Sequence, residues 1–265
     1  MKKTIAIFAI GALAFSAKAQ ELTSKKGFPI LPEAGDWSIS FDAVPFLDFA
    51  FDKTRIMSGA AATSAGGALD YSVANNIVGK YMKDANTAYR GRVQFNFNRL
   101  SENTYVGKTG STTGETVKDN EVTSNSIINL GGGIQYYRGK GRLRGFYGGE
   151  GLITIASGPS KTYTYGNAVE ANNPGTRDKE EKAGMGFGLG VRGFIGAEYF
   201  FAPKMSIGAE FGWGIGMFSV GEGEKTTEGW DGTAVKSTTV KTGGISNFNM
   251  GVDNAGGSIN LAIYF

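Results

Sequence analysis

Eight separate segments of this chain alternate between apolar and polar residues with a period of two. This period predicts β-strands with two chemically different faces, because successive side chains of a strand point to opposite sides of the sheet. Each segment has about ten residues or more, which is long enough for a tilted strand to cross a bilayer. The segments are residues 37–51, 73–82, 87–98, 126–138, 144–156, 184–201, 205–219 and 256–265.

Charged residues inside these segments share a face with Gly, Ser, Asn and Gln. In segment 87–98, for example, Arg90 and Arg92 lie on the face opposite Val93, Phe95 and Phe97. An Arg or Lys that faces lipid at mid-membrane costs about 2–4 kcal/mol, so the apolar face must meet lipid or a protein core. We therefore predict that one set of charged side chains points into the interior of the fold: Asp42, Asp48, Lys80, Arg90, Arg92, Glu150, Arg192, Glu198 and Glu210.

Aromatic residues on the apolar face gather at one end of the segments, next to the shorter connections. Such rings are amphipathic and favour the headgroup zone of a membrane, whereas a soluble β-sandwich gives no reason for them to follow one rim. The apolar faces are therefore predicted to contact lipid. The predicted aromatic girdle consists of Trp37, Tyr81, Tyr89, Tyr136, Tyr147, Tyr199 and Phe265.

The first 19 residues have the organisation of a secretory signal peptide. Two lysines precede an apolar run too short to span a bilayer, and small residues at Ala17 and Ala19 predict cleavage before Gln20. Three of the 27 basic residues lie in this segment, so the exported chain is formally neutral against its 24 acidic residues. It therefore lacks the basic field of a nucleic-acid-binding protein. Since the chain has no cysteine, it forms no disulfide and carries no lipid on a cysteine.

Short and long connections alternate between the segments. The short ones are residues 83–86, 139–143 and 202–204, and the long ones are 52–72, 99–125, 157–183 and 220–255. Outer-membrane barrels combine short periplasmic turns with long extracellular loops, and strands satisfy their backbone hydrogen bonds in lipid only as a closed barrel. The predicted fold class is all-β, an eight-stranded antiparallel up-and-down transmembrane β-barrel at 37–265, after a signal peptide (1–19) and a short periplasmic segment (20–36).

The chain resembles the small eight-stranded outer-membrane barrels of Gram-negative bacteria, the OmpA-like and OmpX-like family. The resemblance covers residues 37–265 and rests on the strand and loop rhythm, the hairpin "VGKYMKDANTAYRGRVQFNF" at 78–97 and the terminal "INLAIYF". It implies an outer-membrane location and recognition of the last strand, ending in Phe265, by the barrel-assembly machinery. It does not imply cell-wall anchoring, because no peptidoglycan-binding domain follows the barrel in this sequence.

The composition argues against an enzyme. The chain has no histidine, the usual carrier of protons near neutral pH, so a Ser-His-Asp triad is impossible. The segment "GKTGSTTGE" at 107–115 lacks the first glycine of a phosphate-binding loop, because Glu102 stands in its place. No metal-ligand spacing stands out, and we expect neither a catalytic residue nor a cofactor.

Three functional interpretations follow. The interior charges are nearly balanced, so salt bridges are expected to plug the narrow lumen of an eight-stranded barrel. The protein would then contribute to envelope integrity or bind surface ligands through its long loops, where Trp230 is a candidate contact residue. The same charges could instead line a diffusion channel for small solutes. A secreted soluble β-rich adhesin is the third interpretation.

Overall fold

The described part of the chain forms a closed ring of antiparallel strands with a long extension on one side. The structure is a computed structural model that describes residues 22–42, 77–252 and 258–265. The ring strands are β1 (Trp37–Asp42), β2 (Ile77–Asp84), β3 (Thr87–Gly107), β4 (Thr116–Arg138), β5 (Leu143–Thr164), β7 (Met185–Ala202), β8 (Met205–Val220) and β12 (Ser258–Tyr264).

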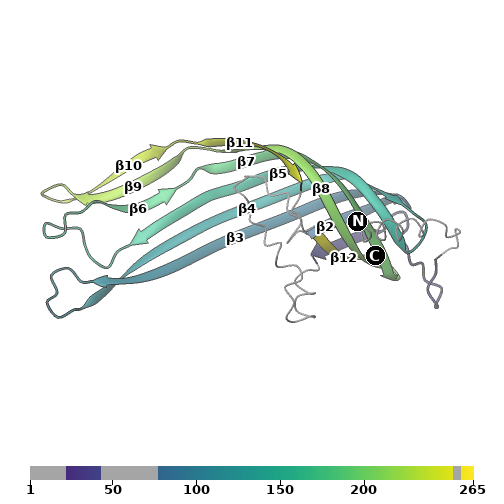
Figure 1. The fold of residues 1–265 in the computed structure, drawn as a ribbon, viewed down its shortest axis with the longest axis horizontal. Helices are drawn as coiled ribbons and strands as arrows, with labels where there is room; N and C mark the ends of the chain where they lie inside the picture. Colours follow the sequence, from purple (N-terminus) through teal and green to yellow (C-terminus); the bar gives the residue numbers. More distant parts are fainter. Residues whose placement is uncertain (1–21, 43–76, 253–257) are drawn as a thin grey trace, which may run out of the picture.

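Strand pairing closes this ring. Each ring strand pairs with the next one along the chain, β5 with β7 and β8 with β12 included. The first strand, β1, pairs with both β2 and β12, which joins the two ends of the sheet. The eight-stranded up-and-down β-barrel predicted from the alternation is therefore confirmed. Figure 1 shows the barrel at the right and the extension at the left.

Several predictions fall on residues that the structure does not describe. These are the signal peptide 1–19, residues 20–21 of the periplasmic segment, the strand residues 43–51, 73–76 and 256–257, the first long loop 52–72, and residues 253–255 of the last long loop. Among the described residues, none forms a helix long and apolar enough to cross a membrane.

The ring strands are joined at one end by the three predicted short turns. In the β2–β3 turn, the backbone N–H of Asn86 donates to the carboxylate of Asp84 at 2.8 Å, an arrangement that favours a tight turn. The β4–β5 turn begins at Gly139, whose φ of 105° suits a glycine. The β7–β8 turn contains Lys204, whose φ of 54° is the only positive value for a non-glycine residue in the described ranges.

Three of the long connections contain strands that the alternation does not predict. β3 and β4 continue without interruption to a hairpin tip at residues 108–115, and β5 continues to Thr164. Four further strands lie in these connections, namely β6 (Arg177–Lys182), β9 (Gly223–Trp230), β10 (Val235–Thr242) and β11 (Ile245–Val252). β4 has 23 residues and is about 75 Å long at roughly 3.3 Å per residue, more than twice the hydrocarbon thickness of a bilayer.

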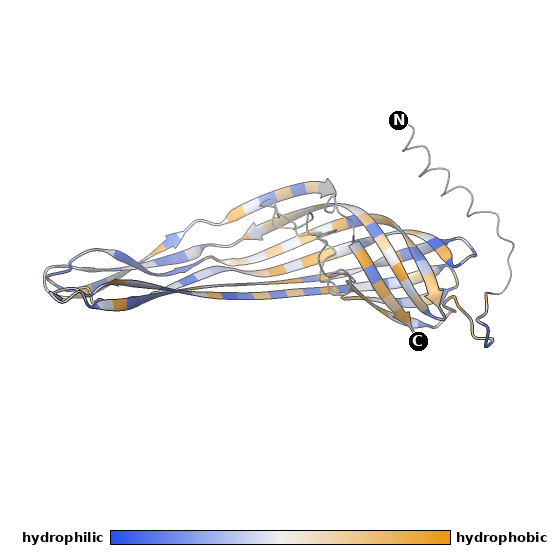
Figure 2. Ribbon diagram, turned by 60° about the horizontal axis from the view of Figure 1, so that its bottom comes forward, coloured by the Kyte–Doolittle hydropathy of each residue, from blue (hydrophilic) through white to orange (hydrophobic). Residues whose placement is uncertain are grey.

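The outer wall of the ring is apolar and the inner wall is polar. On β3, Val93 is 42% exposed and Phe95 is 56% exposed, whereas Arg92 is 3% exposed. The outward apolar series ends at Phe97, because the next outward residue is Arg99. Figure 2 shows apolar and polar residues alternating along the barrel strands.

Two neighbouring glycines of β4 show how closely the inner wall is filled. A Cβ atom on Gly132, which faces outward, would meet no atom within 4 Å. A Cβ atom on Gly133, which faces inward, would lie 2.1 Å from the carbonyl oxygen of Gly149 and 2.6 Å from the Cβ of Glu150. The lumen therefore accepts glycine alone at this point.

The N-terminal segment 22–36 caps the short-turn end of the barrel. Ile30 is 1% exposed and packs with side chains of the lumen at the short-turn end, including Met82 and Tyr264. The carbonyl of Ile30 accepts a hydrogen bond from the N–H of Lys204 at 3.0 Å. The Lys204 ammonium also lies 2.9 Å from the carboxylate of Asp36. The cap is therefore held by apolar packing, by backbone hydrogen bonds and by one ion pair.

Candidate functional site

Charged side chains from five ring strands converge in the lumen of the barrel. They point inward because each occupies the polar parity of its strand, the same parity as the buried Gln94 and Thr154. None is more than 7% exposed. The structure brings together seven of the predicted interior residues: Lys80, Arg90, Arg92, Glu150, Arg192, Glu198 and Glu210.

The other two predicted interior residues are not placed. Asp42 is the last residue of β1, and its backbone is opposite Asn260, but its side chain is not among those that the structure describes. Asp48 lies outside the described residues.

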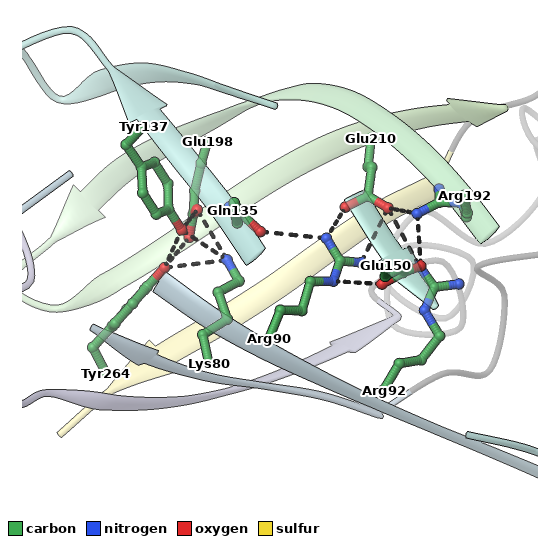
Figure 3. A network of polar contacts seen from close by, with 10 residues as sticks. All are labelled: Lys80, Arg90, Arg92, Gln135, Tyr137, Glu150, Arg192, Glu198, Glu210 and Tyr264. Atoms are coloured by element: carbon green, nitrogen blue, oxygen red, sulfur yellow. Dashed lines mark hydrogen bonds and ion pairs between the residues drawn. The ribbon is translucent and has the colours of Figure 1, made fainter. Parts of the chain in front are cut away.

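An arginine–glutamate cluster fills the middle of the lumen. It consists of Arg90, Arg92, Glu150, Arg192 and Glu210 (Figure 3). Glu210 lies 2.5 Å from Nη1 of Arg90 and 2.7 Å from Nη1 of Arg192. Glu150 lies 2.6 Å from Nη2 of Arg92 and 3.0 Å from Nη1 of Arg192. Each carboxylate therefore contacts several guanidinium groups, which offsets the cost of burying them.

A lysine–tyrosine cluster lies closer to the short turns. It consists of Lys80, Tyr137, Glu198, Ser206 and Tyr264. The ammonium group of Lys80 lies 3.1 Å from Oε2 of Glu198 and donates to both tyrosine hydroxyl groups, at 3.0 and 3.2 Å. The hydroxyl groups of Ser206 and Tyr264 donate to Oε1 of Glu198 at 2.5 and 2.8 Å. The positive charge of Lys80 and the negative charge of Glu198 therefore neutralise each other within this cluster.

Little space remains between these two clusters. The amide oxygen of Gln135 accepts from Nη1 of Arg90 at 3.3 Å and lies between them (Figure 3). A cavity of about 20 Å³, lined by Lys80, Arg90, Glu198 and Glu210 among others, separates the charged groups. This volume holds about one water molecule. In the part of the lumen that the structure describes, the charged side chains are therefore closely packed around this small cavity.

The sequence analysis missed several lumen residues, among them Ser206 of the lysine–tyrosine cluster. Tyr137 and Tyr264 are fully buried inward residues, although tyrosines elsewhere in the strands face outward. Arg144 is 2% exposed and donates to the carbonyl oxygen of Ala85 and the side chain of Asn86, both at 2.8 Å. Strand parity was the available signal, because each missed residue shares its parity with interior residues. Gln135, which lies between the two clusters, was missed as well.

The predicted girdle residues lie at the short-turn rim. The rings of Trp37 and Tyr81 are 4.9 Å apart between centroids, and Tyr89 lies beyond Tyr81 at 6.5 Å. On the next strands the rings of Tyr136 and Tyr147 are 5.6 Å apart. The two remaining residues also fall at this rim, since Tyr199 is opposite Leu143 and Phe265 donates its N–H to the carbonyl of Trp37.

Trp230, the predicted loop contact, ends strand β9 in the extension. It lies opposite Val235 across the β9–β10 hairpin and is partly buried. The charged stretch 177–182 is strand β6, where Arg177 pairs with Glu228 of β9 at 2.8 Å. The extension is therefore an ordered sheet with Trp230 near its outer end.

Comparison with solved structures finds a similarity to the outer membrane protein OprG from Pseudomonas aeruginosa. The alignment covers 89% of this chain and 98% of that chain, with 11% sequence identity and a TM-score of 0.33. No family model and no curated protein matches the chain. The barrel architecture consequently stands on the strand pairing of this chain, and membership of the OmpA-like and OmpX-like family stays a prediction.

Proposed function

We propose that the protein is a non-enzymatic outer-membrane barrel with a plugged polar interior, which contributes to envelope integrity or binds surface ligands through its extracellular strands. The observation that carries the proposal is the packing of the lumen. Seven charged side chains meet there in two paired clusters, and the cavity between them has a volume of about 20 Å³. A pore would require water to replace these ion pairs along the whole axis.

Single-channel recording tests the plug against the rival diffusion channel. The protein, folded and reconstituted in a planar bilayer, is expected to give no steady conductance steps. Well-resolved openings of constant size would refute the plugged interior and favour the small-solute channel.

The membrane assignment is supported by the apolar outer wall and by the aromatic residues at one rim. Val191 and Ile195 of β7 are 59% and 62% exposed, values that suit contact with lipid and would be unfavourable in water. Cell fractionation and gel electrophoresis test this assignment. We expect the unheated protein in the outer-membrane fraction to migrate faster than the heated protein. Recovery from the soluble fraction, without a fast-migrating form, would favour the secreted adhesin.

The orientation of the barrel is the second part of the proposal. The extension is placed outside the cell because outer-membrane barrels have their short turns in the periplasm. Since the chain has no native cysteine, single cysteines report sidedness cleanly. Gly107 and Gly141 suit this test, because a Cβ atom would meet nothing within 4 Å at either position.

Intact cells that express Gly107→Cys should react with a membrane-impermeant maleimide. Cells that express the matched variant Gly141→Cys, in the β4–β5 turn, should react only after the outer membrane is permeabilised. The reverse pattern would invert the orientation and remove the extension as a candidate ligand-binding surface.

The proposed partners follow from this orientation. Outer-membrane lipid would contact the apolar wall. The barrel-assembly machinery would recognise the last strand, β12, together with Phe265. Trp230 is the proposed contact residue for a surface ligand, because aromatic residues contribute strongly to binding interfaces.

A further inference from the structure

Basic residues of the β4–β5 turn and of the extension differ in whether they pair with carboxylates. The β4–β5 turn carries Arg138, Lys140 and Arg142 within five residues, and it contains no acidic residue. Among the described side chains, none of these three forms an ion pair with a carboxylate. The turn therefore presents three uncompensated positive charges at the rim of the barrel.

Basic residues of the extension are arranged differently. Lys108 pairs with Glu115 at 2.8 Å, and Lys161 pairs with Glu121 at 3.0 Å. On the neighbouring strands, basic side chains of β6 and β9 pair with acidic ones across the sheet, as Lys225 does with Asp178. Most of the positive charge of the extension is thus neutralised locally, whereas that of the turn is not.

The positions of the two arginines identify the depth of this charge. Arg138 donates from Nη2 to the hydroxyl of Tyr147 at 3.1 Å, and its guanidinium lies 5.7 Å from the centre of the same ring. Arg142 donates to the carbonyl of Phe201, an outward residue that is 42% exposed. Because Tyr147 belongs to the aromatic rim, both guanidinium groups lie at the level that lipid headgroups would occupy.

We propose that the β4–β5 turn binds the phosphate headgroups of anionic phospholipids in the leaflet at the short-turn end. The turn combines three features of such a site: uncompensated positive charge, headgroup depth and adjacent outward aromatic rings. Arginine suits this ligand because its planar guanidinium donates two parallel hydrogen bonds to a phosphate. The inference rests on the proposed membrane location but not on the state of the lumen.

Fluorescence quenching by brominated lipids tests this inference. A fluorophore attached to Gly141→Cys lies within the turn, and the protein is reconstituted in phosphatidylcholine vesicles. Brominated phosphatidylglycerol or brominated phosphatidylcholine is then titrated in. A basic residue at an anionic surface contributes about fivefold to lipid partitioning. We expect phosphatidylglycerol to quench at least about fivefold more effectively, with a preference that falls as salt screens the charges.

The triple variant Arg138→Gln, Lys140→Gln, Arg142→Gln, carrying the same label, should quench equally with both lipids. A matched control removes three exposed lysines of the extension, as Lys108→Gln, Lys236→Gln, Lys241→Gln, and should retain the preference. Heat-dependent gel mobility verifies that both variants are folded.

The outcomes separate this inference from the proposed function. Equal quenching of the parent protein by both lipids, or a preserved preference in the folded triple variant, would overturn the headgroup site while leaving the barrel in the membrane. Absence of quenching by either lipid would show that the rim does not contact a bilayer, and it would overturn the membrane assignment and the headgroup site together.

Discussion

The substitution Glu210→Gln tests the buried charge cluster directly. Glu210 is 4% exposed, and its carboxylate contacts Arg90 at 2.5 and 3.0 Å and Arg192 at 2.7 Å. Glutamine keeps the shape of the side chain but has no charge, and its NH₂ group would face guanidinium donors. Three arginines would then share Glu150 as their only acidic partner within the cluster.

The expected loss follows from this geometry. Removal of one partner from a buried ion pair costs about 3–5 kcal/mol. With a urea dependence of roughly 2 kcal/mol per molar, the midpoint of unfolding should fall by about 2 M. The assay is urea unfolding in detergent micelles, followed by tryptophan fluorescence and by the fast-migrating band on an unheated gel.

An exposed ion pair provides the matched control. Glu115 accepts from Lys108 at 2.8 Å, a distance similar to those in the cluster, but the two side chains are 56% and 53% exposed. Glu115→Gln should cost less than about 1 kcal/mol, because solvent screens exposed pairs. Equal shifts for Glu115→Gln and Glu210→Gln would refute the argument that burial determines the magnitude.

A second substitution tests whether charge balance is the cause. Arg92 is 3.5 Å from Glu210 but 2.6 Å from Glu150, so it depends least on Glu210. The double variant Arg92→Gln, Glu210→Gln restores the net charge of the cluster, and we expect it to recover about 1–3 kcal/mol of the lost stability. Additive losses in the double variant would contradict this explanation.

Three further predictions concern the walls of the barrel and the extension. Val93→Arg should impair assembly far more than Asn96→Arg, because Val93 is 42% exposed on the outer wall and an arginine there costs about 2–4 kcal/mol; equal yields of folded protein would reverse the face assignment. Gly132→Val should fold and Gly133→Val should not, as judged by gel mobility, because only the second substituent meets backbone atoms within 3 Å. The pKa of Asp231 should be below its usual value because two backbone N–H groups of its own turn donate to it. Because folding lowers this pKa, the ionised carboxylate stabilises the turn at pH values above the unfolded-state pKa of about 3.9. That stabilisation is lost as the pH falls through the lowered pKa. An NMR titration of the Asp231 carboxyl carbon measures this pKa.

The ring itself was predictable because lipid and lumen impose opposite demands on adjacent residues. On β3, Arg92 and Val93 differ in exposure as their parity requires, and the same rule assigns both faces of β7 and β8. A one-residue shift would move every charge to the wrong face, so the pattern fixes the register strongly.

The extension could not be delimited in the same way. Between Arg99 and the hairpin tip, side chains on both faces of β3 are exposed to solvent. The difference in hydropathy between alternate residues therefore disappears, although the backbone pairing continues to Gly107. Residues such as Thr104 and Tyr105 favour strands by their shape, but they carry no signal of sidedness. The alternation therefore ends at the predicted membrane boundary and not at the end of the strand.

The site was predictable in part. Charge and parity together identified the members of the arginine–glutamate cluster, but Tyr137 and Tyr264 were not among the predicted interior residues. Tyr137 faces inward because its hydroxyl donates to Glu198 at 2.8 Å, a partner that no local pattern reveals. The cap was also missed, since the segment 22–36 has no alternation and is positioned by contacts with distant strands.

The position of the cap has a consequence for the order of assembly. Its docking surface combines Met82 of β2 with Lys204 from the β7–β8 turn and Tyr264 of the closing strand. These residues come together only after β1 has paired with β12. The complete binding surface for Ile30 therefore exists only in the closed barrel. Burial of the Ile30 side chain would indicate that β1 has paired with β12.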